Sequence, residues 1–195
     1  MKIVHLCISN FYVENMGYQE NILPRKHKQQ GHKVTIITTP YSFDYNGNSY
    51  ERPVGIKYNE DGIPVIVLKY KKLPFKMARY LHYVDGLYSK LEEIKPDIIF
   101  SHGVSFFSIY ELKYYCKKYK TRLFCDCHAD YFNTTTKGVK YGIINGFFWP
   151  IVARTIIPYI EKAWGTTPAR CEYLKTVYKF PSDKVDLLVM GGDED

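Results

Sequence analysis

The sequence predicts an α/β protein with a doubly wound, mostly parallel sheet that has helices on both faces. The first observation behind this prediction is the regular alternation of short apolar runs with longer segments of helical periodicity. The second is that the apolar runs, such as 2–8 and 33–38, are continuous, which is typical of parallel strands buried on both sides. With 195 residues, 46% of them hydrophobic, the chain can build one domain around an ordinary core.

Turn residues and apolar periodicity locate the elements of the first half. Strands are expected at 2–8, 33–38 and 64–70. A helix is expected between the first two strands, at 17–30, although Pro24 lies inside it. The segment 40–60 is rich in turn residues, and Asn46-Gly47-Asn48 and Asp61-Gly62 predict hairpins. The clearest helix is expected at 75–94, because its apolar residues recur on one stripe.

The second half repeats the alternation. Strands are expected at 98–101, 122–127, 162–165 and 185–190, and helices at 106–119, 141–158 and 167–179. Thr167 and Pro168 suit the start of the last helix, because Thr caps helices and Pro fits the first helical position. The apolar stretch 142–158 is shorter than the roughly 20 residues of a membrane-spanning helix, so we expect it to pack on the sheet. The whole order predicts a Rossmann-like fold.

The end of the chain predicts that part of a larger protein is missing. Gly191-Gly192 interrupts the last expected strand, and three acidic residues follow without a closing helix. In an open α/β sheet a helix normally covers such a strand. We therefore expect residues 1–190 to form one domain and residues 191–195 to begin a linker to a second domain.

The positive charge is concentrated in one third of the chain. The net charge is +7, and the segment 69–122 holds twelve Lys and Arg against five Asp and Glu, which accounts for all of it. Its densest part, 69–79, has five cations and no acid. This pattern suits a phosphate-rich partner or an anionic membrane surface, and equally a solvated face of an enzyme that works on anions. No recognition motif accompanies it, so no nucleic-acid partner is expected.

The five cysteines predict free thiols rather than disulfides or a metal site. Their number is odd and their spacing fits no disulfide framework, which favours a reducing compartment. Cys125 and Cys127 are separated by one residue, whereas zinc sites usually space paired cysteines by two to four and need a second pair. Both are expected on one buried face of a strand, with Asp126 on the other face as a buried partner. The N-terminus has no signal-peptide pattern, so a cytoplasmic protein is expected.

The candidate site residues follow expected strands. The first loop contains neither G-x-G-x-x-G nor a P-loop, so no NAD, FAD or other cofactor is expected. Gly17 stands at a helix N-terminus, where free amides favour an anion such as a diphosphate, although the spacing alone is better explained by a helix start that needs a flexible residue. His102 and His128 lie where ligands of open α/β sheets bind, and each could also be an ordinary hydrogen-bonded loop residue.

Four groups of residues together resemble a known family. They are Met16-Gly-Tyr-Gln-Glu-Asn21, Gln30-Gly-His-Lys-Val-Thr-Ile-Ile-Thr38, Lys95-Pro-Asp-Ile-Ile-Phe-Ser-His-Gly103, and 164–169 with 184–193. In order and spacing they resemble the N-terminal domain of two-domain GT-B glycosyltransferases of the large retaining family 4. The resemblance covers essentially the whole chain and implies a Rossmann-like, acceptor-side half of a GT-B fold.

The resemblance also implies roles for individual residues. Gly17 matches the family's glycine-rich loop, so Gly17 and Tyr18 are expected beside the donor diphosphate, although Met16 replaces a second glycine. His128 matches the histidine that contacts the donor sugar, and we expect it to orient the sugar and stabilise charge rather than act as a base. His102 and Asp130 are expected on the acceptor side. The family's main donor-binding residues lie in the second domain.

The function implied by the resemblance is retaining sugar transfer. The donor would be a nucleotide sugar and the acceptor a sugar or a lipid-linked sugar, in cell-surface polysaccharide or glycolipid synthesis. Positioning and charge stabilisation would supply catalysis, and the chain alone is expected to be inactive. The alternative is a stand-alone, flavodoxin-like binding module without catalysis. The basic segment 69–79 and the helix after it predict a peripheral contact with an anionic membrane or with a phosphate-bearing acceptor.

Overall fold

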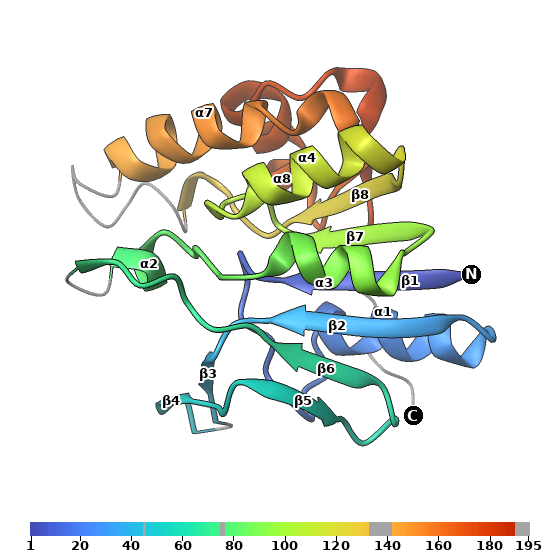
Figure 1. Cartoon of the computed structure of the whole chain (residues 1–195). Helices are drawn as coiled ribbons and strands as arrows, with labels where there is room; N and C mark the ends of the chain where they lie inside the picture. Colours follow the sequence, from blue (N-terminus) through green and yellow to red (C-terminus); the bar gives the residue numbers. More distant parts are fainter. Residues whose placement is uncertain (45, 75–76, 133–141, 190–195) are drawn as a thin grey trace.

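The protein is built around one twisted sheet, seen in the computed structural model in Figure 1. Within residues 1–44, 46–74, 77–132 and 142–189, which the structure describes, eight strands form this sheet in the order β10-β9-β8-β7-β1-β2-β6-β5. The strands are β1 (Lys2–Cys7), β2 (Lys33–Thr38), β5 (Gly55–Tyr58), β6 (Pro64–Val67), β7 (Ile98–His102), β8 (Arg122–Cys127), β9 (Ile160–Gly165) and β10 (Val185–Leu187). All neighbours pair in parallel except β5 and β6 at one edge. The predicted mostly parallel sheet is confirmed.

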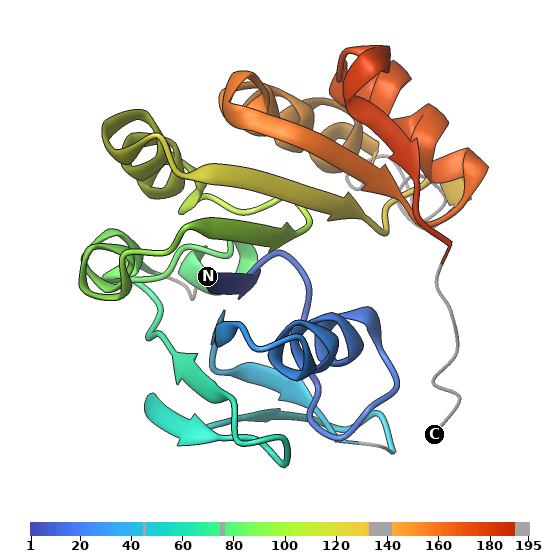
Figure 2. The ribbon, with the colours of Figure 1, turned by 90° about the vertical axis from the view of Figure 1, so that its right-hand side faces the viewer.

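Helices cover the two faces of the sheet unequally. The α-helices are α1 (Gln19–Gln29), α2 (Met77–Tyr80), α3 (Leu87–Ile94), α4 (Ile109–Tyr119), α7 (Trp149–Arg154) and α8 (Pro168–Tyr173). Short π-helices at Ile144–Phe148 and Leu174–Tyr178 and 3-10 helices at Ile157–Tyr159 and Ser182–Lys184 extend them. Figure 2 shows α1 on the opposite side of the sheet from α3 and α4. The larger core lies on the α3 and α4 side, where Val4, Leu6, Leu87 and Leu112 are buried together.

The helix expected at 75–94 is wrong as a single element. Residues 75–76 lie outside the described residues, and from Met77 onward the segment forms two short helices, α2 and α3. His82 and Gly86 both have left-handed backbone (φ 47° and 83°), and Val84 between them pairs with Tyr70 in an isolated bridge. The apolar stripe nevertheless faces the core, since Val84, Leu87 and Leu91 are fully buried. Periodicity identified the buried residues correctly and missed the break.

The turn-rich segment 40–60 contains more structure than expected. Strands β3 (Tyr41–Phe43) and β4 (Ser49–Glu51) pair in antiparallel fashion, and β5 follows as an edge strand. The two hairpin signals are confirmed, because β3–β4 surrounds Asn46-Gly47-Asn48 and a turn with Gly62 at φ 65° joins β5 to β6. The strands themselves were missed because they are short and mostly exposed, so no continuous apolar run marks them.

The predicted helix 141–158 is interrupted in its described part. A π-helical turn, α7 and a 3-10 turn follow one another between Ile144 and Tyr159. Trp149, Val152 and Ala153 pack into the core, as expected for a helix on the sheet. Among the described residues, no helix combines the length and the apolar character needed to cross a bilayer. The start of α8 is confirmed, since the Thr167 side chain accepts the backbone N–H of Arg170. Strand β10 ends at Leu187, and the expected linker 191–195 lies outside the described residues.

Candidate functional site

A pocket opens at the carboxyl edge of the parallel strands, between the loop after β1 and the start of α8. Its volume is about 600 Å³. Polar and charged side chains on its wall come from segments far apart in the sequence, namely Asn10, Tyr18, Glu20, Asp44, His128 and Arg170. Met16 and Tyr18, the two neighbours of Gly17, both line it together with His128. The expected convergence of the first loop and the end of β8 at one crevice is therefore present.

The loop around Gly17 brings the N-terminus of α1 to this pocket. Tyr18 is the N-cap residue with extended backbone, and no side chain caps the helix. A Cβ at Gly17 would meet no atom within 4 Å, so glycine leaves open space here rather than relieving a clash. Free backbone amides at such a helix start can bind an anion. Glu20 in the first turn is buried, however, and its Oε1 accepts a hydrogen bond of 3.2 Å from Asn10 Nδ2.

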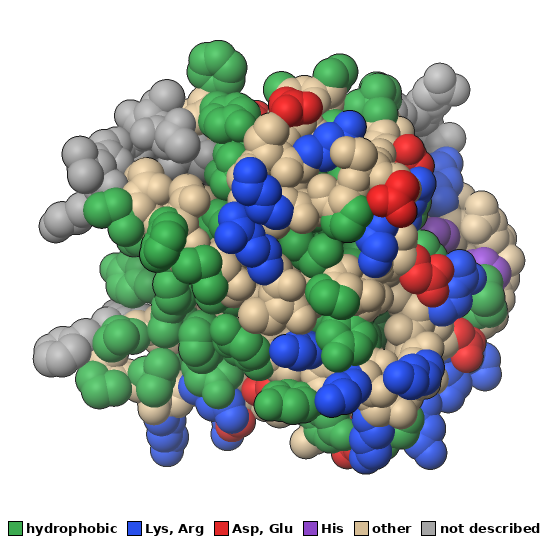
Figure 3. Space-filling view, turned by 90° about the horizontal axis from the view of Figure 1, so that it is seen from above, with side chains coloured by type: hydrophobic (Ala, Val, Ile, Leu, Met, Phe, Trp, Pro, Cys, Tyr) green, Lys and Arg blue, Asp and Glu red, His purple; other side chains and the backbone are tan. Residues whose placement is uncertain are grey.

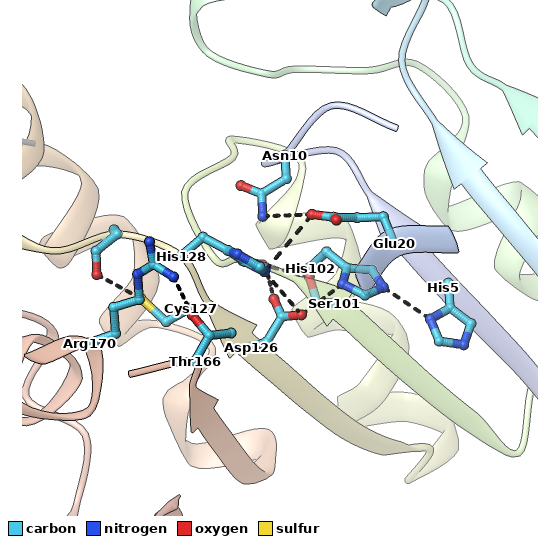
Figure 4. A network of polar contacts seen from close by, with 12 residues as sticks. His5, Asn10, Glu20, Ser101, His102, Asp126, Cys127, His128, Thr166 and Arg170 are labelled. Carbon is cyan, nitrogen blue, oxygen red and sulfur yellow. Dashed lines mark hydrogen bonds and ion pairs between the residues drawn. The ribbon is translucent and has the colours of Figure 1, made fainter. Parts of the chain in front are cut away.

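His128 stands between two carboxylates at the inner wall of the pocket (Figure 4). Its Nε2 lies 3.5 Å from Asp126 Oδ2 and 3.9 Å from Glu20 Oε1, and its side chain is 22% exposed. Burial alone would lower the pKa of this imidazole, but Asp126 and then Glu20 outweigh burial and raise it. Compared with a free histidine, His128 is thus shifted toward the imidazolium form, which can stabilise negative charge.

Asp126 is the buried partner that the sequence predicted. One of its oxygens, Oδ2, lies 2.8 Å from His102 Nδ1, and the other accepts the backbone N–H of Gly103 at 3.1 Å. Burial opposes ionisation, but His102 and His128 hold the pKa of this carboxyl well below its usual range. Gly103 has φ 87°, and a Cβ there would come within 2.7 Å of Ser9 Oγ. Glycine is needed at this turn.

His102 lies behind the pocket rather than on its surface. Its side chain is fully buried, and both ring nitrogens have partners, Asp126 on one side and His5 on the other at 3.0 Å. Contact with an acceptor would require His102 to leave both hydrogen bonds. Asp130, the other expected acceptor-side residue, is nearer to the pocket, with its Oδ2 3.5 Å from Nε of Arg170.

Sequence reasoning missed Arg170 and Glu20. Arg170 lies in the first turn of α8 and also contacts the Thr166 hydroxyl, while Glu20 lies in the first turn of α1. Both helices were predicted, and both begin just after a strand or its loop. A search for charged residues in the first turns of helices at the carboxyl edge would have found them.

One group of side chains in the described part of the chain could be considered for a metal ion. Ligand atoms of Glu20, His102 and His128 lie within 4.8 Å of one another. Both nitrogens of His102 are already hydrogen-bonded, so this residue can ligate only if a buried bond breaks. The cysteines do not contribute. All five are free, and Cys125 and Cys127 pack into the core on the opposite face of β8 from Asp126.

Comparison with known families assigns the chain to a protein family. Its sequence matches Glycosyltransferase Family 4 over residues 23–194, which is most of its length. The chain belongs to Glycosyltransferase Family 4. No curated protein matches it significantly.

Solved structures with the same fold include other sugar-transferring enzymes. A sucrose-phosphate synthase from Thermosynechococcus elongatus superposes with a TM-score of 0.63 at 12% identity, covering 99% of this chain and 91% of that one. The catalytic domain of starch synthase IV from Arabidopsis thaliana, bound to ADP and acarbose, gives 0.58 at 16% identity, covering 98% and 52%. The lipopolysaccharide outer core galactosyltransferase WaaB gives 0.58 at 14%, covering 97% and 45%.

The chain therefore spans about half the length of the latter two proteins. At these identities the likeness concerns the fold. It confirms the prediction of a Rossmann-like GT-B glycosyltransferase domain, and the family match supplies the sugar-transfer class.

Proposed function

We propose that this Family 4 protein transfers a sugar from a nucleotide-sugar donor to an acceptor. In this proposal residues 1–190 form the acceptor-side domain, residues 191–195 lead to a donor-binding domain, and the reaction retains the anomeric configuration, as the family resemblance implies. The observation that carries the proposal is the position of His128, a histidine whose pKa is raised by Asp126 and Glu20, on the wall of a polar pocket at the carboxyl edge of the sheet. Ligands of open α/β sheets bind at this edge.

The charges around the pocket suit a sugar more than a bare phosphate. Arg170 and His128 are basic side chains, whereas Glu20 and Asp44 on the same wall are acidic. Sugar hydroxyls both donate and accept hydrogen bonds, so they can use both kinds of group. A diphosphate would be repelled by the carboxylates and would find its partners at the amides of Tyr18 and Gln19 and at His128. In this arrangement His128 contacts the sugar and stabilises charge on the leaving group.

The test is a donor screen on the protein that carries this domain together with its donor-binding domain. Release of nucleoside diphosphate is measured for a panel of nucleotide sugars, and NMR of the product gives the anomeric configuration. We expect turnover with at least one donor and a retained configuration, and no turnover by residues 1–195 alone, because half a cleft cannot hold the donor in reacting geometry. Robust turnover by residues 1–195 alone would contradict the division into two halves.

A lipid-linked acceptor is supported by an exposed apolar patch, which we define as Leu73, Met77, Tyr80, Ile143, Ile144, Phe147 and Ile151. Trp149 in α7 contacts His82, which follows α2, so the two parts of the patch are neighbours. Figure 3 shows hydrophobic side chains gathered at one end of this face, with Lys and Arg beside them. Such a combination is typical of proteins that lie on a membrane surface.

The cations of segment 69–79 contribute less than their number suggests. Lys69 and Lys71 both pair with Asp85, and Arg79 lies over the Tyr41 ring and 3.9 Å from Glu51. We therefore propose a peripheral contact with an anionic membrane in which the apolar patch supplies most of the affinity. Co-sedimentation with anionic vesicles at rising salt tests this. Ile143→Ser should weaken binding strongly, whereas Ile56→Ser, a change at an equally exposed residue of β5, should not. Equal binding to neutral and anionic vesicles at low salt would contradict the electrostatic contribution to membrane binding. Unaltered binding by Ile143→Ser would contradict the contribution of the apolar patch.

A further inference from the structure

Three hydrogen-bonded histidines, of which His5 and His102 are fully buried and His27 is half-buried, form a continuous column behind Asp126. His102 Nε2 lies 3.0 Å from His5 Nδ1, and His5 Nε2 lies 3.0 Å from His27 Nδ1. His5 and His102 are fully buried on neighbouring strands, and their rings are stacked with centroids 5.3 Å apart. His27 lies on α1, so the column runs from Asp126 along the face of the sheet that α1 covers and ends at this helix. Figure 4 shows its inner part, from His128 through Asp126 to His5.

One carboxylate determines where every proton of this column lies. The Gly103 N–H points at Asp126 Oδ1, and the carboxylate has no proton to give, so His102 must carry its proton on Nδ1. When His102 is neutral, its Nε2 is an acceptor, and His5 must then donate from its Nδ1. By the same argument His5 Nε2 accepts and His27 donates from Nδ1. All three rings are therefore held in the Nδ1–H tautomer.

The same carboxylate also faces His128. Its Oδ2 is 2.8 Å from His102 Nδ1 and 3.5 Å from His128 Nε2, so the two imidazoles share one oxygen. We propose that Asp126, fixed from behind by the histidine column, is the positioning residue that holds the His128 ring and its charge in the sugar pocket. This inference rests on the proposed function, since it gives His128 its role. The histidine column thereby extends the site beneath α1, beyond the residues that touch the pocket.

The charged and titratable groups around the column support this arrangement. Asp126 from β8, Glu20 from α1 and Arg170 from α8 act on His128. His102, His27 and Asp126 act on His5, and burial lowers the pKa of His5 well below its ordinary value. His5 and His27 are therefore neutral near neutral pH, as the tautomer argument requires. The negative charge of Asp126 remains available to His128.

Asp126→Asn tests the column because it should reverse the direction of each hydrogen bond along the three histidines. The Gly103 N–H still needs an acceptor, so the Asn carbonyl oxygen should take the place of Oδ1 and the NH₂ group should face His102. His102 Nδ1 must then accept, which moves its proton to Nε2, and the same switch must follow at His5 and His27. A comparable change from Asp to Asn in a serine-protease triad leaves a histidine in the wrong tautomer. Long-range ¹H–¹⁵N spectra of the six histidines of residues 1–195 distinguish protonated from unprotonated ring nitrogens.

We expect the Nδ1–H tautomer at all three histidines of the wild-type chain and the Nε2–H tautomer in Asp126→Asn. The midpoint of the His128 titration should fall, because an amide replaces its carboxylate. Asp186→Asn is the matched control, the same change at an exposed residue of the edge strand β10, and should alter neither readout. Unchanged tautomers or an unchanged His128 titration in Asp126→Asn would overturn the proposal.

His5→Phe gives an independent test if Asp126→Asn folds poorly. Phenylalanine keeps an aromatic ring between Phe100 and His102 and removes both hydrogen bonds of the column. The Asp126 carboxylate lies at the other end of the column from His27. His102 should therefore keep its Nδ1–H tautomer and His128 its titration midpoint, and only His27 should lose its hydrogen-bond partner in the column. A tautomer change at His102 in this variant would show that Asp126 does not set the column, and would contradict the proposal.

Measurement of turnover then distinguishes a positioning role of Asp126 from a purely structural one. In the enzyme that carries this domain, Asp126→Asn should lower kcat by about 10- to 100-fold, the range seen when groups that orient a functional side chain are removed. If Asp126→Asn shows the Nε2–H tautomers but an unchanged kcat, the positioning role of Asp126 is refuted. If no donor is turned over by the wild-type enzyme, the proposed function fails, while the tautomers and the His128 titration still decide whether Asp126 holds His128.

Discussion

His102 and Asp126 form a fully buried pair, with Nδ1 and Oδ2 2.8 Å apart and neither side chain exposed to solvent. They are register partners at the carboxyl ends of β7 and β8, so the parallel sheet itself places them side by side. The next residues along β8 bring His128 to the pocket. Asp126 therefore acts on the charge of His128 from beneath the pocket, in addition to Glu20 on the pocket wall.

Three buried or half-buried histidines predict a protein that loses stability on mild acidification. Burial lowers the pKa of His5, His27 and His82 in the folded chain, whereas the unfolded chain has ordinary values of about 6.5. Below that pH the unfolded state binds more protons, so the free energy of unfolding falls. His128 has a raised pKa in the folded chain, so its protonation favours the folded state at lower pH, but it is a single group opposed by three. Thermal melts between about pH 7.5 and about pH 5 should show a falling Tm. A Tm that is constant or rises over this range would contradict the prediction.

Gly165 is predicted to tolerate no side chain. A Cβ there would come within 2.4 Å of the backbone nitrogen of Cys171, where α8 packs against the end of β9. Gly165→Ala should lower the free energy of unfolding by about 1–3 kcal/mol, as overpacking does. Gly146→Ala is the control, because its Cβ would meet nothing within 4 Å and alanine favours the helix by about 0.5–1 kcal/mol. Urea unfolding measures the free energy of unfolding of both variants. Equal changes in Gly165→Ala and Gly146→Ala would contradict the close packing at Gly165.

Cys171 is predicted to be the one thiol that reacts in the native protein. It is partly exposed, whereas the other four cysteines are buried. Burial raises the pKa of Cys116 and Cys127 to about 12 and that of Cys7 and Cys125 well above the ordinary value. Thiolates are the reactive form, so these four should resist alkylation. Mass spectrometry after brief treatment with iodoacetamide should find a single modified peptide. Modification of Cys125 or Cys127 at a similar rate would indicate an open core.

Much of the fold could be predicted from the sequence because buried parallel strands are continuous apolar runs. The strands β2 and β8 were predicted with their observed bounds. The three-residue strands β3 and β4 were missed because they are too short to carry such a run, and β4 is also fully exposed. The break between α2 and α3 was missed because an apolar stripe continues across it.

The site was predictable only in part. Parallel strands collect their carboxyl ends at one edge, so the convergence of His128 with the loop of Gly17 could be foreseen. The burial of His102 and the column through His5 to His27 could not, because they depend on which neighbouring strands pair and in which register. The helix-borne Arg170 and Glu20 depend on the path of the loops that precede them.

The most direct test of the account is the turnover of the enzyme carrying this domain after His128→Ala, with His32→Ala as a matched change at a histidine outside the pocket. The account predicts that His128→Ala lowers kcat by about 10²- to 10³-fold, the range for removing one charge-stabilising group, while KM for the donor changes little and the melting curve keeps its cooperativity. His32→Ala should behave like the wild type. Unchanged kcat in His128→Ala, or an equal loss in both variants, would contradict the assignment of His128 and of the pocket around it.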